Sequence, residues 1–248
     1  MSKVCILGAT GMSGRRLVRQ GLDKGHVVTA LVRNSGRFEP PENERLMVRY
    51  VEFDRQEELS RAMAGHDVVI NAAGHLDAAD FNPLVQRIIG AAEEALGAGG
   101  RFWMFAGAAL LDVPGTTRMT VTLPGVPKIY QRHRANYQAI TRTQLDWSVL
   151  CPGPMIEAPD GRASEGLVLS REVWPTPRPA ITRALPSLAL SVAFRMAVPR
   201  LTIFYEDAAS VILDHLQADG PLSRSRVGIA LPVGQRRHKS APAPADRS

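Results

Sequence analysis

Three glycines near the start of the chain are spaced so that the backbone around them could hold a phosphate group. Gly8, Gly11 and Gly14 fall in the sequence Gly-Ala-Thr-Gly-Met-Ser-Gly, between an apolar run at residues 4–7 and a helical pattern at residues 15–24. A glycine lets the backbone approach a pyrophosphate closely, and a helix N-terminus supplies free N–H groups and the positive end of a dipole. The spacing differs from Gly-x-Gly-x-x-Gly, the commonest dinucleotide fingerprint, and such glycines can also form only a turn. Their place between a predicted strand and a predicted helix favours a nucleotide site.

The residue that follows the second predicted strand, residues 26–32, distinguishes a site for NAD from a site for NADP. A site for NAD places Asp or Glu about 20 residues beyond the glycine loop, where the carboxylate accepts hydrogen bonds from the ribose hydroxyls. This chain instead has Arg33, followed by Asn-Ser-Gly-Arg. A carboxylate would repel the 2′-phosphate of NADP, whereas an arginine can pair with it through two hydrogen bonds. Although surface arginines are common at strand ends, this one and the glycine loop together favour NADP(H) as the cofactor.

A second group of residues, on a predicted helix over residues 127–142, could exchange protons or hold an anion. Its members, at positions i, i+3, i+4 and i+7 along one helix face, are Tyr130, His133, Arg134 and Tyr137. If that face points toward a bound cofactor, His133 or Tyr137 could donate a proton, because the ordinary pKa of histidine suits acid–base work near neutrality. Arg134 could then hold an anion. The alternative is a polar surface helix whose aromatic side chains pack on a sheet.

The apolar patterns around these residues alternate between strands and helices. Strands are expected at residues 4–7, 26–32, 46–52, 68–74, 101–105, 145–151 and 227–231, and helices at residues 15–24, 56–63, 81–96, 127–142 and 205–216. This alternation predicts a parallel sheet with helices on both faces, which is the Rossmann-type doubly wound α/β fold. At the end of the fourth strand, the small residues Ala72, Ala73 and Gly74 let the backbone pass close to a bound cofactor, or form a tight turn.

We expect one NAD(P)-binding domain over residues 1–234. A small C-terminal cap over the substrate is expected mainly from residues 155–200, which contain six prolines and are the least readable part of the chain. Within them, residues 188–197 are apolar but carry Arg195, and they are too short to span a bilayer. This stretch predicts a cap helix or the interface helix of a homodimer. Residues 235–248 are rich in Ala, Pro and charge and are expected to form a disordered tail.

The composition is that of a globular protein, since 45% of the 248 residues are hydrophobic and 22% are charged. Residues 1–7 lack the basic and long apolar segments of a secretory signal, which favours a cytoplasmic location. The net charge of +6 comes largely from scattered arginines and the basic stretch 235–239, without interleaved aromatic residues. We therefore expect a small-molecule substrate, and neither nucleic acid nor a membrane as a partner. No metal is expected, because no Cys/His cluster has the spacing of metal ligands.

Several motifs spread over residues 3–232 carry a resemblance to a known family. They are the glycine loop, Arg33, Asp54, the small residues 71–74, Leu-Asp-Trp-Ser at 145–148 with Pro152 and Gly153 after it, and Tyr-Glu-Asp-Ala-Ala at 205–209. Together they resemble the atypical NAD(P)H-binding branch of the short-chain dehydrogenase/reductase superfamily, which includes NmrA-like and biliverdin-reductase-B-like proteins. The glycine loop and the Asp-Trp-Ser…Pro-Gly segment are the more specific of these motifs.

The resemblance implies a role for each matched position. The pyrophosphate would be wrapped by Gly8, Thr10, Gly11, Met12 and Gly14. Arg33 would meet the 2′-phosphate, and Asp54 would lie beside the adenine. The ribose and nicotinamide side would be bordered by Ala72, Ala73 and Gly74, and the residues that approach the nicotinamide would be Pro152 and Gly153.

The Ser-Tyr-Lys triad of the superfamily is missing from this sequence. The tyrosine of that triad lies four residues before the lysine, and here the tyrosine with a basic residue at that distance is Tyr130, followed by Arg134. The fork of an arginine cannot simply replace a lysine ammonium, and residues 106–109 hold no serine. The resemblance and the complete cofactor site predict an NADP(H)-dependent oxidoreductase that transfers hydride to a small, partly apolar acceptor without this triad. The alternative is a non-catalytic NADP(H)-binding redox sensor that a protein partner recognises.

Overall fold

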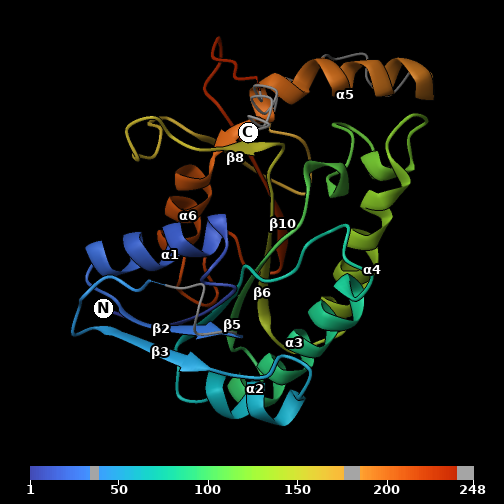
Figure 1. The fold of residues 1–248 in the computed structure, drawn as a ribbon. Helices are drawn as coiled ribbons and strands as arrows, with labels where there is room; N and C mark the ends of the chain where they lie inside the picture. Colours follow the sequence, from blue (N-terminus) through green and yellow to red (C-terminus); the bar gives the residue numbers. More distant parts are fainter. Residues whose placement is uncertain (34–38, 176–184, 239–248) are drawn as a thin grey trace, which may run out of the picture.

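The computed structural model describes residues 1–33, 39–175 and 185–238, and its centre is a twisted sheet (Figure 1). The strands of this sheet are β1 (Lys3–Leu7), β2 (Val27–Val32), β3 (Leu46–Tyr50), β4 (Val68–Asn71), β5 (Arg101–Phe105), β6 (Asp146–Cys151), β8 (Val168–Arg171) and β10 (Ser225–Ala230). They lie in the order β3-β2-β1-β4-β5-β6-β10-β8, and all neighbours are parallel except β10 and β8. This order is that of a Rossmann-type doubly wound sheet, in which ligands bind where the strand order reverses, here between β1 and β4.

Helices cover both faces of the sheet (Figure 1). On one face α1 (Met12–Asp23) packs against α6 (Tyr205–Leu213), and the helices on the other face are α2 (Gln56–Met63), α3 (Phe81–Leu96) and α4 (Gln131–Ile140). Alternate residues of β1 serve the two cores: Val4 and Ile6 pack under α1 and α6, while Cys5 and Leu7 pack under α2 and α3. A strand buried on both faces must be apolar throughout, which explains the continuous apolar run that predicted it.

The expected strands correspond to β1 to β6 and β10, with some ends shifted. The largest shift is at the fourth strand, which ends at Asn71 and not at Gly74. There the Asn71 Oδ1 accepts a hydrogen bond from the N–H of Ala73 at 2.9 Å, which turns the chain out of the sheet. The small residues therefore form the expected tight turn beside the switch point of the sheet, and their approach to a cofactor stays a prediction.

Three short strands were not expected. Within the described residues they are β8 and the pair β7 (Met155–Ile156) and β9 (Ile203–Phe204), which form a separate two-stranded parallel sheet. β8 lies at the edge of the main sheet and is half-buried without the alternation of apolar and polar residues that would reveal a strand. Such elements are defined by the strands that they pair with, and the local sequence carries little signal for them.

Four helices differ in extent from their predictions. Two of them are α1, which begins at Met12 and not at residue 15, and α6, which ends at Leu213 and not at residue 216. The helix expected over residues 127–142 is shorter, because Pro127 has extended ψ and Lys128–Tyr130 form a 3₁₀ turn before α4 begins at Gln131. The apolar stretch 188–197 is part of a longer helix, α5 (Ser187–Leu201), which includes Pro199 near its C-terminal end. An exposed apolar stripe along α5 is formed by Leu188, Val192 and Met196. The role of this helix in a homodimer stays a prediction.

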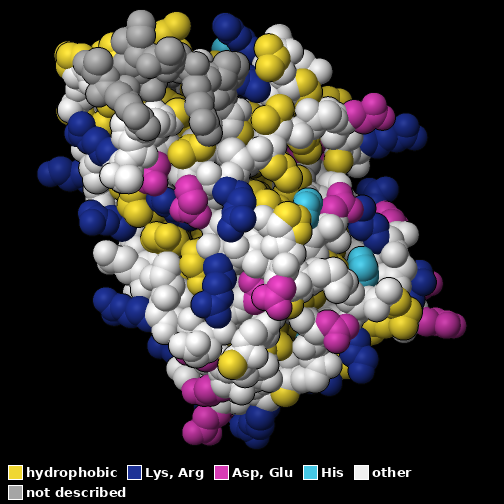
Figure 2. All heavy atoms as spheres, turned by 180° about the vertical axis from the view of Figure 1, so that it is seen from behind, with side chains coloured by type: hydrophobic (Ala, Val, Ile, Leu, Met, Phe, Trp, Pro, Cys, Tyr) yellow, Lys and Arg dark blue, Asp and Glu magenta, His cyan; other side chains and the backbone are white. Residues whose placement is uncertain are grey.

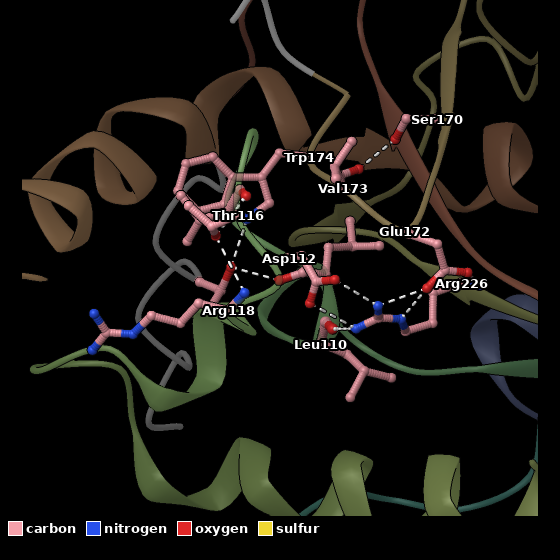
Figure 3. Close-up of polar contacts among 12 residues, drawn as sticks. Leu110, Asp112, Thr116, Arg118, Ser170, Glu172, Val173, Trp174 and Arg226 are labelled. Atoms are coloured by element: carbon pink, nitrogen blue, oxygen red, sulfur yellow. Dashed lines mark hydrogen bonds and ion pairs between the residues drawn. The ribbon is translucent and has the colours of Figure 1, made fainter. Parts of the chain in front are cut away.

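A buried arginine ties the loop after β5 to the last strands of the sheet (Figure 3). The guanidinium of Arg226, on β10, donates two hydrogen bonds to the carboxylate of Asp112, at 2.9 and 3.1 Å, and one to the Leu110 carbonyl at 2.6 Å. It also pairs with Glu172 at 2.6 Å. Glu172 itself has a left-handed φ of 66°, a strained conformation that these contacts hold in place.

The first residues of the expected tail lie against the rest of the chain. Arg237 forms an ion pair with the buried Asp207 at 3.1 Å, donates to the Ser164 hydroxyl at 2.8 Å and covers the ring of Phe204. Residues 239–248, the remainder of that tail, lie outside the described residues. On the face shown in Figure 2, Lys and Arg side chains are scattered among Asp and Glu side chains and form no large patch.

Candidate functional site

The glycine loop after β1 is packed so tightly that two of its glycines could not carry a side chain. Gly8 has a φ of +76°, and a Cβ on it would lie 2.6 Å from the backbone of Ala72 and Ala73. A Cβ on Gly14 would lie 2.0 Å from the carbonyl oxygen of Gly8. Gly11 is the N-cap of α1, and no side chain of the described residues caps this helix end. The N–H groups of the first turn are therefore free for an anion, which the positive end of the helix dipole also attracts.

A cavity of about 650 Å³ lies at the switch point of the sheet. It is lined by the loops after β1 and β4 and by the end of β2, and its lining includes the predicted residues Gly8, Thr10, Gly11, Arg33, Ala72, Ala73 and Gly74. The exposed Arg33 lies with its guanidinium carbon 5.8 Å from the centroid of the Phe53 ring. The backbone-lined cradle and the arginine at its end fit a dinucleotide with a charged group at one end.

The other predicted residues of this group lie outside the cavity lining. Gly14 is buried in the packing between α1 and the loop, Met12 is exposed at the start of α1, and Asp54 is exposed beside the loop that holds Phe53. The residues that the sequence analysis missed are Leu31, Val32, Phe53, His75, Ala78, Asp80 and Leu84. Phe53 could have been found as the apolar neighbour of Asp54 at the end of the third strand.

A second cavity, of about 720 Å³, lies beyond the carboxyl ends of β5 and β6. Its walls are mainly apolar and come from residues 106–109, 125–127 and 152–155 and from α5, together with Tyr130 and His133. Pro152 and Gly153, which the resemblance places near a nicotinamide, both line it. A Cβ on Gly153 would lie 2.7 Å from the carbonyl oxygen of Leu201, so only glycine allows α5 to approach this closely.

The four candidate residues for proton chemistry do not act as one group. Tyr130 and His133 line the second cavity, with their rings stacked at 6.3 Å between centroids, whereas Arg134 is exposed and lies outside the lining. Tyr137 packs edge-on against Trp147 at 5.7 Å and beneath the guanidinium of Arg226. Two of the four residues therefore line the cavity, and Tyr137 packs on the sheet as the alternative expected. Tyr130 precedes α4, Arg134 is turned about 100° from His133, and Tyr137 lies a turn further along the helix.

The surroundings of His133 also change its chemistry. Its ring lies between Tyr130 and Phe81, and burial lowers the pKa of His133 to about 4. The imidazole is therefore neutral near pH 7 and offers one N–H donor and one acceptor nitrogen. The lowered pKa disfavours the protonated imidazole near neutrality, and a role of His133 as proton donor stays a prediction. Burial raises the pKa of the Tyr137 phenol, so that group keeps its proton and is also neutral.

Two polar residues of the second cavity were not predicted as site residues. Ser191 and Arg195 reach it from α5. Arg195 was noted only as an interruption of an apolar run, and a charge inside an apolar helix was the available signal.

Among residues 1–33, 39–175 and 185–238, no three His, Cys, Asp or Glu side chains are grouped to hold a metal ion. In the same residues, no helix has the length and apolar character needed to cross a bilayer.

The doubly wound sheet and the glycine-lined cavity at its switch point define a Rossmann-type nucleotide-binding protein. Residues 8–184 match the model of the NAD(P)H-binding family, and the chain belongs to this family. This match agrees with the NAD(P)H binding that the resemblance implied. The chain is also 28% identical over 166 residues to the uncharacterized protein YwnB of Bacillus subtilis, a match that covers 62% of this chain and 73% of that protein.

Solved structures agree with this fold. A short-chain dehydrogenase/reductase from Veillonella parvula superposes with a TM-score of 0.70 at 19% identity, over 97% of this chain and 100% of that one. A provisionally assigned NADH-flavin reductase from Streptococcus pneumoniae gives a TM-score of 0.70 at 21% identity, over 94% and 100% of the two chains. A Rossmann-fold NAD(P)-binding family protein from Shigella flexneri gives 0.67 at 17% identity, over 97% and 98%. At these identities the likeness concerns the fold alone.

Proposed function

We propose that this chain is an NADP(H)-dependent oxidoreductase that passes hydride from the nicotinamide to a small, partly apolar acceptor. The observation that carries the proposal is the pairing of two cavities at one edge of the sheet. The first follows β1, β2 and β4 and has the shape and backbone lining for a dinucleotide. The second follows the neighbouring strands β5 and β6 and is mainly apolar. A dinucleotide that begins at Arg33 and ends at Gly153 would present its nicotinamide to the second cavity.

The cofactor contacts in this proposal use mostly backbone. Gly8, Thr10, Gly11 and the first turn of α1 hold the pyrophosphate, while Gly14 allows the loop and helix to pack. Arg33 pairs with the 2′-phosphate, which favours NADP(H) over NAD(H). The ribose and nicotinamide side rests on Ala72, Ala73 and Gly74, and then on Pro152 and Gly153. Met12 and Asp54, which lie outside the cavity lining, stay predictions from the resemblance alone.

The bound cofactor supplies the hydride, and the chain's own residues position the acceptor. The phenol of Tyr130 and the neutral imidazole of His133 are the hydrogen-bonding groups that this part of the second cavity offers to an acceptor oxygen or nitrogen. A flavin, quinone or tetrapyrrole accepts hydride with little help from a strong acid, which suits a cavity without a Ser-Tyr-Lys triad. The name of the Streptococcus pneumoniae relative, a flavin reductase, supports flavins as the first acceptors to try. In this proposal residues 1–234 act as one domain, with the cap drawn mainly from residues 155–200.

The direct test is to incubate the purified protein with NADPH and a panel of flavins, quinones and carbonyl compounds. We expect at least one acceptor to give saturable NADPH oxidation well above that in buffer. NADH at the same concentration is the matched control and should be the poorer donor. Tight NADPH binding without oxidation by any acceptor would contradict the enzymatic proposal.

A redox sensor that binds NADP(H) without turnover is the second candidate. The observation that favours it is the missing Ser-Tyr-Lys triad beside a cavity lined for a dinucleotide. Calorimetry of NADP⁺ and NADPH separates the two functions. A sensor must prefer one redox state, because a ligand pair of equal affinity shifts no conformational population. Equal affinities would therefore rule out the sensor.

A further inference from the structure

The second cavity carries an unbalanced positive charge. Among the described residues that line it, Arg195 is the one Arg or Lys, and none is Asp or Glu. His133 adds no charge near neutral pH, because burial lowers its pKa to about 4. The side chain of Arg195 is exposed, so its charge is hydrated when no ligand is bound. Because no carboxylate of the described lining balances it, this arginine can attract an anion into the cavity.

The structure holds Arg195 over the cavity by the way α5 docks. The hydroxyl of Ser191, one helical turn earlier, donates a hydrogen bond to the Pro124 carbonyl at 2.7 Å. This bond fixes α5 on the loop that contains Gly125. A Cβ on Gly125 would lie 2.9 Å from the Nη2 of Arg195, so the guanidinium rests directly above this glycine. The left-handed φ of +74° and the missing side chain at Gly125 make room for it.

No protein group neutralises this guanidinium in the part of the chain that the structure describes. Within residues 1–33, 39–175 and 185–238, Arg195 takes part in none of the hydrogen bonds or ion pairs, and residues 176–184 contain no Asp or Glu. Its five N–H donors are therefore free for a ligand. An arginine pairs with phosphate, sulfonate or carboxylate groups through two parallel hydrogen bonds.

The helix also separates the backbone of Arg195 from the proposed nicotinamide end of the cavity. Leu201 packs against Gly153, which lies at that end, and Arg195 is six residues earlier on the same helix. Six residues of α-helix span about 9 Å. A ligand that reaches both ends is therefore elongated, with an apolar body between its reacting atom and its charged group.

We infer that Arg195 binds an anionic group of the acceptor, whose apolar body occupies the rest of the cavity and whose reacting atom lies near Gly153. The substrate class is thus an elongated apolar acceptor that carries a phosphate, sulfonate or carboxylate. This inference rests on the proposed function for the reaction, but not for the binding of the anion. Arg195 selects the acceptor and takes no part in the hydride step.

Riboflavin and riboflavin 5′-phosphate are a matched pair of probes, because they share one ring system and differ in the phosphate. Their Kd values for the NADP⁺-loaded protein and their KM values with NADPH are compared in the unaltered protein. We expect the phosphate form to be favoured about tenfold, the ratio that one charge-assisted pair of about 1.4 kcal/mol gives. Naphthoquinone and naphthoquinone sulfonate repeat the comparison without a phosphate, and so separate a phosphate site from a general anion site.

Substitutions at Arg195 then assign the preference to this side chain. Arg195→Gln should abolish the preference for the anionic probe and leave the neutral probe and the Kd of NADPH unchanged. Arg195→Lys should restore part of it, and the exposed Arg142→Gln, which changes the net charge equally, should have no effect. Equal affinity for the neutral and anionic members of both pairs would overturn the inference, as would a failure of both anionic probes to bind. Preferential binding of the anion without turnover would support Arg195 while contradicting the proposed hydride transfer.

Discussion

Arg33 is the side chain on which the choice between the two dinucleotides rests in this account. It lies at the end of β2, lines the first cavity and is exposed beside the ring of Phe53. A guanidinium there attracts the 2′-phosphate of NADP, and a carboxylate would repel it while accepting hydrogen bonds from the ribose hydroxyls of NAD.

Replacing this residue by its opposite tests the assignment. Arg33→Asp should raise the Kd of NADPH roughly 10- to 100-fold and leave the Kd of NADH unchanged or lower, because one charge-assisted pair is lost. Titration calorimetry with both cofactors measures the ratio. Arg142→Asp, an exposed site after α4, is the control for net charge. An unchanged ratio of the two Kd values would refute the phosphate assignment.

His133 predicts a pH dependence of stability with a definite sign. Its pKa is lowered in the folded protein to about 4 by burial, whereas an unfolded histidine has a pKa of about 6.5. Between these values the unfolded chain binds more protons, so the free energy of unfolding falls as the pH falls below about 6.5. At pH 5 the loss from this group is about 2 kcal/mol relative to pH 7.

The measurement is urea unfolding at the two pH values for the unaltered protein and for His133→Asn. The variant should lose less stability on acidification, by the amount that His133 contributes. His75→Asn, at an exposed position, is the matched control and should behave like the unaltered protein. A variant with the same acid sensitivity as the unaltered protein would show that His133 is not buried as described.

At the scale of secondary-structure elements, stability and NADPH binding both depend on the contact between the glycine loop and α1. Gly14→Ala should lower the free energy of unfolding by about 3 kcal/mol and weaken NADPH binding, because its Cβ would lie 2.0 Å from the Gly8 carbonyl oxygen and push helix and loop apart. Gly90→Ala is the control on a helix: its Cβ would meet only the flexible end of Gln56, and alanine favours a helix by up to about 1 kcal/mol. Chemical unfolding and calorimetry measure both effects. Equal behaviour of the two variants would contradict the packing described for the loop.

The contacts of Arg226 join the edge of the sheet to the loop that precedes the second cavity (Figure 3). Arg226→Met removes the partner of Asp112 and Glu172 and should cost about 2–3 kcal/mol, less than for a fully buried pair because Glu172 is 39% exposed. The KM of the acceptor should rise, since Ala108 and Ala109 line the cavity just before Leu110. The Kd of NADPH should not change.

Arg171→Met supplies the comparison for this substitution. Arg171 lies at the end of β8, next to Glu172, but its guanidinium is exposed and, among the described residues, donates to the Ser223 carbonyl alone. Its loss should cost less than about 1 kcal/mol. Unfolding in denaturant measures both variants, and equal costs would mean that the Arg226 cluster contributes no specific stability.

The elements that sequence could predict are those whose own residues determine them. β1 is apolar on both faces and α3 has a continuous apolar stripe, so both follow from local patterns. β8 has no such pattern and exists because β10 offers it a partner. The start of α4 was predicted too early because Pro127 and a 3₁₀ turn precede it, and helical spacing alone cannot tell which residues a neighbouring sheet will cover.

For the whole molecule, the sequence predicted the glycine cradle of the first cavity, but it predicted the second cavity only in part, through Tyr130, His133, Pro152 and Gly153. Gly8, Gly11 and Arg33 follow strand ends that converge at the switch point of any doubly wound sheet. The second cavity depends on α5, which folds back from far along the chain so that Arg195 lies above Gly125 and Leu201 against Gly153. Contacts between such distant segments depend on the tertiary fold, which explains why Ser191 and Arg195 were missed as site residues.

The central claim for the whole molecule is that the two cavities cooperate in hydride transfer. The most direct measurement is anaerobic single-turnover oxidation of NADPH by an acceptor from the panel, compared with NADPH deuterated at the transferred position of C4. The account predicts oxidation that saturates with acceptor, slows with the deuterated cofactor and is lost in Gly14→Ala in step with NADPH binding. Oxidation no faster than in buffer, while NADPH is fully bound and all acceptors are present, would contradict it.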